Sequence, residues 1–297
     1  MTLDAAHPFA GPSPLPFHLP DFAAIRPEHY REAFDAGMAE GLAELDALAA
    51  DPAPPTAENV LDAWERSGKV LDRAVEAFYV VKWAESSDAL DALEAEYAPK
   101  LAAHSDAIFM NADLYDRLRA LDARAKAGEV ELDAEVSWLL EDLLAAFVRN
   151  GVALASEDQE TLRGINARLA ELGTAFDRAN LDARNSGAIV VKDASQLNGL
   201  SPDDLASLAQ PDGTHKIDLV NTSQHPLLEK LTNRDVRRRV YEASVNRALG
   251  RPGADGTPGP DTRPLIVEIA RLRAQRATLL GYANHAELVT ERACAKS

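Results

Sequence analysis

Apolar residues recur every three or four positions between residues 26 and 51, and this spacing predicts an amphipathic helix. Pro27 and Glu28 suit the first turn of such a helix, and the proline-rich segment 51–55 ends it. The apolar stripe consists of Tyr30, Phe34, Met38, Leu42, Leu45 and Leu48. The helix therefore has one face that can join a core.

A second helix is expected after Thr56, which is a favourable N-cap residue, and Gly68 is expected to bend it. Its apolar residues are Val60, Leu61, Trp64, Val70, Leu71, Val75, Phe78 and Tyr79. The next helices are expected at about 88–110, 112–126 and 133–150. Asn111 is expected as a cap between the first two, and Gly151 as a stop after the third.

The longest helix is expected to begin at Ser156, because Ser156 and Gln159 have the spacing of a capping box. Its apolar positions alternate steps of three and four at Leu162, Ile165, Leu169, Leu172 and Phe176. This alternation favours a seam against a partner helix, as in an antiparallel helix hairpin.

Residues 187–221 have a different pattern. Two short β-branched segments, GAIVVKD and HKIDLV, are typical of strands, and SPDDLASLA between them predicts a small helix capped by Ser201. Helices then resume after the cap residue Asn233 as far as Gly250, and again from Thr262 to Leu280. The segment between these helices, GRPGADGTPGPDT, is rich in glycine and proline and predicts an exposed loop.

These patterns predict a mainly α fold, a multi-helix lobe with antiparallel helix hairpins and a small two-strand β insert near 187–221. Four segments are expected: an extended N-terminal segment (1–25), a helical lobe (26–186), the β/α insert (187–221) and a helical continuation (222–297). Phe17, Leu19 and Phe22 in the first segment have the spacing of a segment that lies across another surface.

Composition limits the partners and the compartment. A hydrophobic fraction of 46% and a charged fraction of 27% are typical of a globular protein. The net charge of −17 argues against a dominant nucleic-acid role, and Arg237-Arg238-Arg239 is interpreted as a solvated helix face. No membrane span or signal peptide is recognisable, and Cys294 is the only cysteine, so we expect a cytoplasmic protein without a membrane partner.

The seven histidines do not form the zinc-protease motif H-E-x-x-H, in which two histidines bind zinc and the glutamate is the general base. None of them precedes a glutamate, and no two lie four residues apart. Near the end of the chain, Asn284 and Glu287 have the spacing of a helix cap. We therefore interpret His285 and Glu287 as residues of a helix start.

Other candidate groups are also interpreted structurally. His104 and Asp106 are two positions apart and do not face each other on a helix, so His104 is expected to be a satisfied helix histidine. Cys294 is not expected to be a nucleophile, and Asp203-Asp204 suit a helix start. Core positions are expected for the aromatic residues Trp64, Phe78, Tyr79, Trp83 and Trp138, with an aromatic-lined groove as the alternative. No catalytic, cofactor-binding or metal-binding residue is assigned.

Six collinear segments carry a family resemblance. They are FAAIRPEHYREAFDAGMAEGLAELDALAADPAPPTAENVLDAWERSGKVLDR, YAPKLAAHSDAIFMNADLYDRL, INARLAELGTAFDRANLDA, LNGLSPDDLASLA, LTNRDVRRRVYEASVNRA and RPLIVEIARLRAQRATLLGYANHAEL. In this order they resemble the N-terminal part of the zinc oligopeptidases related to thimet oligopeptidase, oligopeptidase A and peptidyl-dipeptidase Dcp. The likeness covers about residues 15–297.

The resemblance implies a largely helical, cytoplasmic metallopeptidase that hydrolyses short peptides in a channel between two lobes. In that family the zinc ligands and the general base lie on an H-E-x-x-H helix and a following glutamate, C-terminal to the part that this chain resembles. The resemblance therefore assigns no catalytic or metal residue here.

Two functions remain open. In the first, the chain is the N-terminal lobe of such an enzyme, inactive and without zinc by itself, and short peptides are the partners of the full-length enzyme; a variant of this function is a complementing fragment that a separately encoded catalytic lobe joins. In the second, it is a stand-alone, non-catalytic helical protein that binds peptides or acts as a scaffold.

Overall fold

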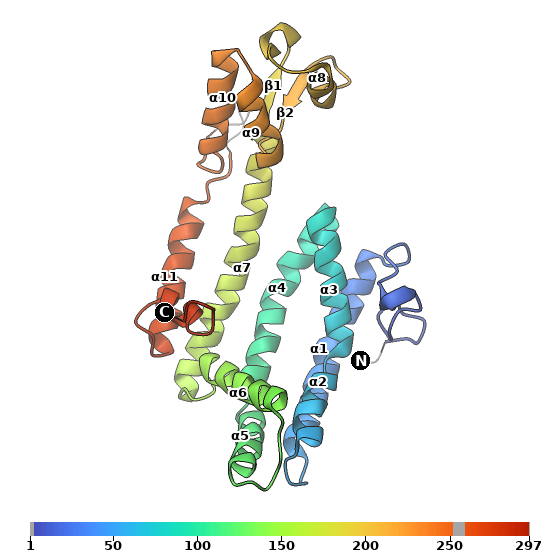
Figure 1. Cartoon of the computed structure of the whole chain (residues 1–297), viewed down its shortest axis with the longest axis vertical. Coiled ribbons are helices and arrows are strands. Elements are labelled where there is room, and N and C mark those ends of the chain that lie inside the picture. Colours follow the sequence, from blue (N-terminus) through green and yellow to red (C-terminus); the bar gives the residue numbers. More distant parts are fainter. Residues whose placement is uncertain (1–2, 252–258, 297) are drawn as a thin grey trace. The chain divides into compact units, whose positions relative to one another are not determined.

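The structure is a computed structural model that describes residues 3–251 and 259–296. The chain divides into two compact units, unit 1 (Met1–Glu171 with Leu272–Ser297) and unit 2 (Leu172–Arg271). Two helices, α7 (Ser156–Ser186) and α11 (Arg263–Leu279), contribute residues to both units. A small antiparallel sheet accompanies the helices (Figure 1), so the predicted mainly α class with a small β insert is confirmed.

The remaining helices of unit 1 lie before α7 and after α11. They are α1 (Pro27–Ala50), α2 (Ala63–Arg66), α3 (Lys69–Ala84), α4 (Asp88–Phe109), α5 (Ala112–Lys126), α6 (Ala134–Arg149) and α12 (His285–Thr290). Short 3₁₀ and π turns occur at Pro16–His18 and Ala57–Asp62.

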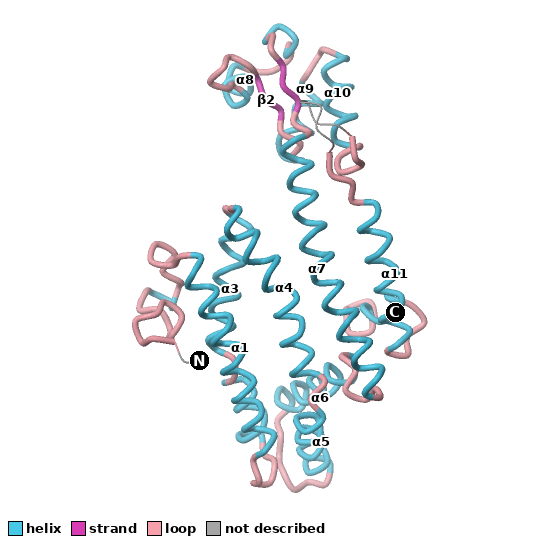
Figure 2. The backbone as a smooth tube through the Cα atoms, turned by 180° about the vertical axis from the view of Figure 1, so that it is seen from behind, coloured by secondary structure: helices cyan, strands magenta, loops and turns pink. Residues whose placement is uncertain are grey.

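The first apolar cluster of unit 1 lies between α1, α3 and α4, which run side by side in Figures 1 and 2. Its centre is a set of aromatic rings from Tyr30, Phe34, Phe78 and Tyr97, with centroids 5.1–6.3 Å apart. Helices α1 and α3 approach closely, because a Cβ atom at Gly37 would lie 2.6 Å from the backbone nitrogen of Leu71. Glycine therefore permits this packing.

A second apolar cluster joins the end of α1 to α5 and α6, with Trp64 packed against it. Arg117 of α5 is buried at its edge and donates hydrogen bonds to the carbonyl oxygens of Asp51 (2.8 Å) and Ala53 (2.7 Å). It also forms an ion pair of 2.9 Å with the Asp51 carboxylate. This guanidinium is thus neutralised inside the unit and holds the segment after α1 against α5.

The helix expected after Thr56 is interrupted. Thr56 caps the first turn as predicted, since its hydroxyl accepts from the backbone N–H of Asn59 at 3.2 Å. The expectation of one helix bent at Gly68 is wrong, because Gly68 has φ +70° and separates α2 from α3. A left-handed residue breaks the hydrogen-bond ladder that a bent helix would keep.

Unit 2 contains the predicted insert. Strands β1 (Ile189–Val191) and β2 (His215–Ile217) pair antiparallel, and α8 (Pro202–Leu208) lies between them in sequence. Ser201 caps α8 through its hydroxyl, which accepts from the Asp204 N–H at 3.1 Å, as the sequence predicts. The core of this unit is formed by Val191, Leu197, Leu208, Ile217, Leu227, Leu231, Val236 and Val240.

Two features of unit 2 differ from the prediction. Helix α9 (Asn221–Lys230) lies within the expected helical continuation 222–297, but the sequence pattern identified no separate helix before Asn233, because α9 contains Pro226 and its buried face includes a glutamine, Gln224. Helix α10 (Arg234–Val245) ends before Gly250, so its predicted C-terminus is wrong. Residues 252–258 of the predicted glycine- and proline-rich loop lie outside the described residues.

The division into segments 1–25, 26–186, 187–221 and 222–297 stays a prediction. In the first of them Phe17 is 95% exposed, and Leu19 and Phe22 are also exposed. Within the part of the chain that the structure describes, no helix is both long enough and apolar enough to cross a membrane.

Candidate functional site

The C-terminal residues that resemble part of a zinc motif form a helix start. The Asn284 side chain accepts from the backbone N–H of Glu287 at 3.0 Å and caps α12. The Glu287 carboxylate accepts from the N–H of Ala283 at 2.8 Å, one residue before the position that a capping box predicts. The cap interpretation is confirmed with this correction to the partner of Glu287.

His104 and Asp106 point to different surroundings on α4. The His104 Nδ1 atom is buried without a hydrogen-bond partner among the described residues, so the expectation of a satisfied histidine is wrong. Burial lowers the pKa of His104. Asp106 is 5% exposed and accepts a hydrogen bond of 2.7 Å from the Asn166 amide.

Asn166 joins Asp106 to a cation. Its amide oxygen accepts from the guanidinium of Arg276 at 3.4 Å. Burial raises the pKa of Asp106, while the Asn166 hydrogen bond and the Arg163 and Arg276 charges oppose this rise. Burial also lowers the pKa of Arg276. These groups therefore form a charge-compensated polar cluster inside unit 1.

The expected aromatic core positions are only partly correct. Phe78 is buried and Trp64 packs against the second apolar cluster. Trp83 and Trp138 are 80% and 61% exposed, so the core expectation is wrong for both. Cys294 is also exposed.

Metal-ligand geometry is not found in the described part of the chain. No three His, Cys, Asp or Glu side chains among these residues are grouped so that they could hold a metal ion. The described residues therefore do not fit the zinc site that the family resemblance implies.

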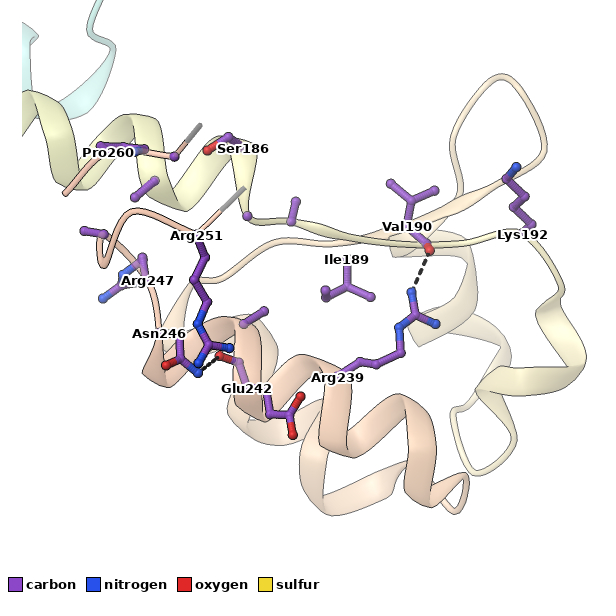
Figure 3. Close-up of a pocket in the computed structure, with 16 residues that line it drawn as sticks. Ser186, Ile189, Val190, Lys192, Arg239, Glu242, Asn246, Arg247, Arg251 and Pro260 are labelled. Atoms are coloured by element: carbon purple, nitrogen blue, oxygen red, sulfur yellow. Dashed lines mark hydrogen bonds between the residues drawn. The ribbon is translucent and has the colours of Figure 1, made fainter. Parts of the chain in front are cut away.

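A cavity of about 600 Å³ in unit 2 is the candidate binding site. Its walls come from the last turn of α7, strand β1, helix α10 and the segment after α10 (Figure 3). Ile189 supplies an apolar wall (Figure 3), together with Ala243 and Ala248. This volume lies within the range of about 300–1,000 Å³ that small-molecule sites occupy.

The charged residues of the cavity are mostly basic. Arg239 donates to the carbonyl oxygen of Val190 at 3.3 Å, and Arg247 donates to that of Leu219 at 2.9 Å. Figure 3 shows Arg239 and Arg251 on either side of Ile189. Glu242 is the acidic residue among the described lining residues. A site of this kind attracts anions.

The rim of the cavity is fixed by backbone bonds. Gly250 donates its N–H to the Pro260 carbonyl at 3.0 Å, and Thr262 donates to the Ala248 carbonyl at 2.9 Å. Ala248 is buried with φ +58°, a left-handed conformation that is unfavourable for alanine. These bonds hold the backbone that follows α10 against the cavity.

Sequence reasoning missed this site. The run Arg237-Arg238-Arg239 was interpreted as one solvated face, yet its three members differ. Arg237 donates to the Leu231 carbonyl at 2.6 Å and Arg238 donates to the Asp235 carboxylate at 3.0 Å. Arg239 alone lines the cavity. The run of three arginines was the only hint of a basic site in the sequence. Which of the three faces β1 depends on how α10 packs in the tertiary fold.

No protein-family model matches the chain. Dipeptidyl carboxypeptidase of Escherichia coli (strain K12) is 34% identical over 94% of this chain and 41% of that protein. The Salmonella typhimurium dipeptidyl carboxypeptidase is 34% identical over 95% of this chain and 41% of that protein. Oligopeptidase A of Salmonella typhimurium is 27% identical over 91% of this chain and 40% of that protein.

The chain thus spans about two fifths of the length of the curated relatives it matches. The similarity runs through nearly all of the chain. The resemblance predicted from the sequence is confirmed: this chain is homologous to a part of the oligopeptidases that include dipeptidyl carboxypeptidase and oligopeptidase A.

Proposed function

We propose that this chain is the N-terminal substrate-channel lobe of a zinc metallopeptidase of the peptidyl-dipeptidase or oligopeptidase type, which hydrolyses short peptides. The observation that carries the proposal is the similarity to dipeptidyl carboxypeptidase over 94% of this chain but only 41% of that enzyme. A polypeptide that matches two fifths of an enzyme along nearly its own full length corresponds to one part of that enzyme.

Hydrolysis is assigned to the part of the relatives that this chain does not match. The 297 residues contain no H-E-x-x-H motif, and the described residues fit no zinc site. The chain alone is therefore proposed to be inactive and to bind no catalytic zinc, because metal-assisted attack needs ligands in fixed positions.

Exposed apolar side chains in unit 1 support a covering partner. Trp83 and Val80 are exposed on α3, and Trp138 and Val148 are exposed on α6. Each pair lies on its own helix, and a partner that covers either of them would remove large apolar side chains from water. The partner is proposed to be a separately encoded catalytic lobe, the substrates are proposed to be short peptides, and the compartment is proposed to be the cytoplasm.

The test is a reconstitution. The purified chain is assayed with added zinc on an internally quenched peptide, alone and mixed with the remaining part of the Escherichia coli dipeptidyl carboxypeptidase. No turnover is expected from the chain alone, and chelator-sensitive turnover is expected from the mixture. Zinc-dependent turnover that co-purifies with the chain alone would contradict the proposed inactivity, and a silent mixture would count against the lobe assignment.

The alternative, a stand-alone peptide-binding or scaffold protein, makes a different prediction. It requires a stable monomer that binds peptides without a second polypeptide. A lobe that normally meets a partner would instead associate through Trp83 and Trp138, which are exposed. Light scattering on the wild type and on a variant with both tryptophans changed to Gln separates the two functions.

A further inference from the structure

The cavity of unit 2 carries positive charge in an acidic chain. Arg239, Arg247, Arg251 and Lys192 line it with Glu242, whereas the whole chain has a net charge of −17. The net negative charge of the whole chain therefore repels anions, and any attraction of an anion to the cavity must come from the basic residues that line it. This contrast distinguishes the cavity from an ordinary solvated surface.

Two of the three arginines, Arg239 and Arg247, are positioned by the backbone. Arg239 and Arg247 each donate to a carbonyl oxygen, and neither forms an ion pair with a carboxylate of the described residues. A guanidinium has five N–H donors, so each retains donors after such an anchor. An anchored guanidinium loses less side-chain freedom when it binds an oxyanion, which favours binding.

Apolar side chains lie among these charges. Ile189 and Ala243 line the same space, and the volume of about 600 Å³ exceeds the need of a bare inorganic ion. Figure 3 shows Lys192 at the far end of β1 with its ammonium directed away from the arginines. The recognition elements are therefore the guanidiniums and the apolar wall.

We propose that the cavity between β1, α10 and the end of α7 binds a small organic anion, whose carboxylate or phosphate groups bind Arg239 and Arg251 while its apolar body contacts Ile189. Carboxylates and phosphates both offer two oxygen atoms that can accept the paired, charge-assisted hydrogen bonds of a planar guanidinium group. This site is separate from the proposed peptidase role, and it is tested on the chain alone.

The experiment is calorimetric titration of the chain at low ionic strength with three probes, which are phenyl phosphate, glutarate and inorganic phosphate. Saturable binding of phenyl phosphate or glutarate is expected, with inorganic phosphate weaker because it has no apolar body. Arg239→Gln and Arg251→Gln should each weaken glutarate, which has one carboxylate for each arginine, about tenfold, the effect of losing one charge-assisted hydrogen bond. Phenyl phosphate has one anionic group, so at least one of the two variants should weaken it by this factor.

A matched control separates the cavity from the overall charge. Arg238→Gln removes the same charge one position earlier on α10, where the arginine pairs with Asp235. It should leave the affinity unchanged. Ala243→Leu should also weaken binding, because the larger side chain takes up part of the cavity without changing any charge. Far-UV circular dichroism checks that each variant is folded.

The pattern of probes decides the ligand class. Saturation by phenyl phosphate alone supports a phosphate ligand, and saturation by glutarate alone supports a carboxylate ligand. The proposal is overturned when none of the three probes saturates, when Arg238→Gln weakens binding as much as Arg239→Gln, or when folded Ala243→Leu binds like the wild type.

Discussion

Buried charged groups in unit 1 are paired with other groups of the fold, whereas the arginines of the unit 2 cavity are not paired with carboxylates of the described residues. In unit 1 the buried Asp106 carboxylate is linked through Asn166 to Arg276, and the buried Arg117 pairs with Asp51. In unit 2, Arg239 and Arg247 of the cavity donate hydrogen bonds to backbone carbonyls and also line an open space. The first arrangement is internally compensated, whereas the second leaves positive charge for an external partner.

The difference shows which polar residues are structural and which are candidates for binding. A buried charge that pairs with other buried groups is required by the fold, because its removal leaves those groups unpaired. A half-open cation with donors to spare contributes little to stability, because water already solvates it. The two units should therefore respond very differently to similar substitutions.

The largest effect is expected from Asn166→Ala in unit 1. This change leaves the buried Asp106 carboxylate without its amide donor and Arg276 without an acceptor. We expect a loss of about 3 kcal/mol in the free energy of unfolding, the cost of unpaired buried groups of which one is charged. Urea unfolding followed by tryptophan fluorescence reports unit 1 alone, because Trp64, Trp83 and Trp138 all lie there.

The matched control is Thr161→Ala, on the same helix at an exposed position. It should change the stability by less than about 0.5 kcal/mol. The comparison between the units fails when Asn166→Ala is as mild as this control, or when the cavity variant Arg239→Gln is as destabilising as Asn166→Ala.

A smaller effect is expected from packing. Gly37→Ala places a Cβ 2.6 Å from the Leu71 nitrogen and should cost about 1–3 kcal/mol in the fluorescence-detected unfolding of unit 1. Gly164→Ala, on α7 with open space around it, should be neutral or stabilising. In unit 2, Ala243→Leu should change stability by less than about 1 kcal/mol, because the cavity can hold the added atoms.

Circular dichroism measures Ala243→Leu, since unit 2 contains no tryptophan. If Ala243→Leu lowers the free energy of unfolding as much as Gly37→Ala does, the larger side chain meets other atoms and the cavity is not open in solution. A neutral Gly37→Ala would mean that α1 and α3 adjust easily.

Local signals made much of the fold predictable from sequence. The caps at Thr56, Asn111, Ser201 and Asn233 all have the expected backbone donors, because capping depends on residues within one turn. Helix α9 was missed because its burial depends on Gln224, whose side chain donates to the Ser244 hydroxyl at 2.8 Å across to α10. That contact is tertiary and leaves no apolar period in the sequence.

The candidate site was harder to predict for the same reason. The cavity combines Ile189 with Arg239 and Arg251, residues that are up to 62 positions apart, since 251 − 189 = 62. The periodicity of strands and helices predicts which face of an element is buried, but not which charged side chains of other elements pack near a short strand. Exposure of Trp83 and Trp138 also could not be read from residue type, since tryptophan is usually well buried.

Opposite pH responses are expected from carboxylates in the two units. Burial raises the pKa of Asp106, so this carboxyl group holds its proton more tightly in the folded protein than in the unfolded chain. Unit 1 therefore loses stability as the pH rises through the raised pKa. Hydrogen bonds from Lys230 and Ser201 lower the pKa of Asp204 to about 2. Its contribution is complete above its ordinary pKa of about 3.9 and is lost as the pH falls towards 2.

Two variants measure these responses. For Asp106→Asn, the free energy of unfolding of unit 1 is measured by tryptophan fluorescence at several pH values. The difference between this variant and the wild type should shift in favour of the variant as the pH rises from acid to neutral, because only the wild type has a carboxyl group to ionise. The stability difference between wild type and Asp204→Asn should shrink between pH 5 and pH 2.5, measured by hydrogen exchange in peptides that cover α8. Parallel pH curves for either variant and the wild type would contradict the assigned direction.

The smallest effect is expected from the exposed tryptophans, and it tests the fluorescence readout on which the comparison depends. Trp83→Phe and Trp138→Phe should each change the stability by less than about 0.5 kcal/mol, because these side chains are 80% and 61% exposed. Removing both should shift the native emission to shorter wavelength, since the remaining Trp64 packs against Phe109 and Phe147 with ring centroids 6.0 and 5.8 Å apart. An unshifted emission maximum would mean that the exposed tryptophans are covered in solution, and light scattering would then show whether a second copy of the chain covers them.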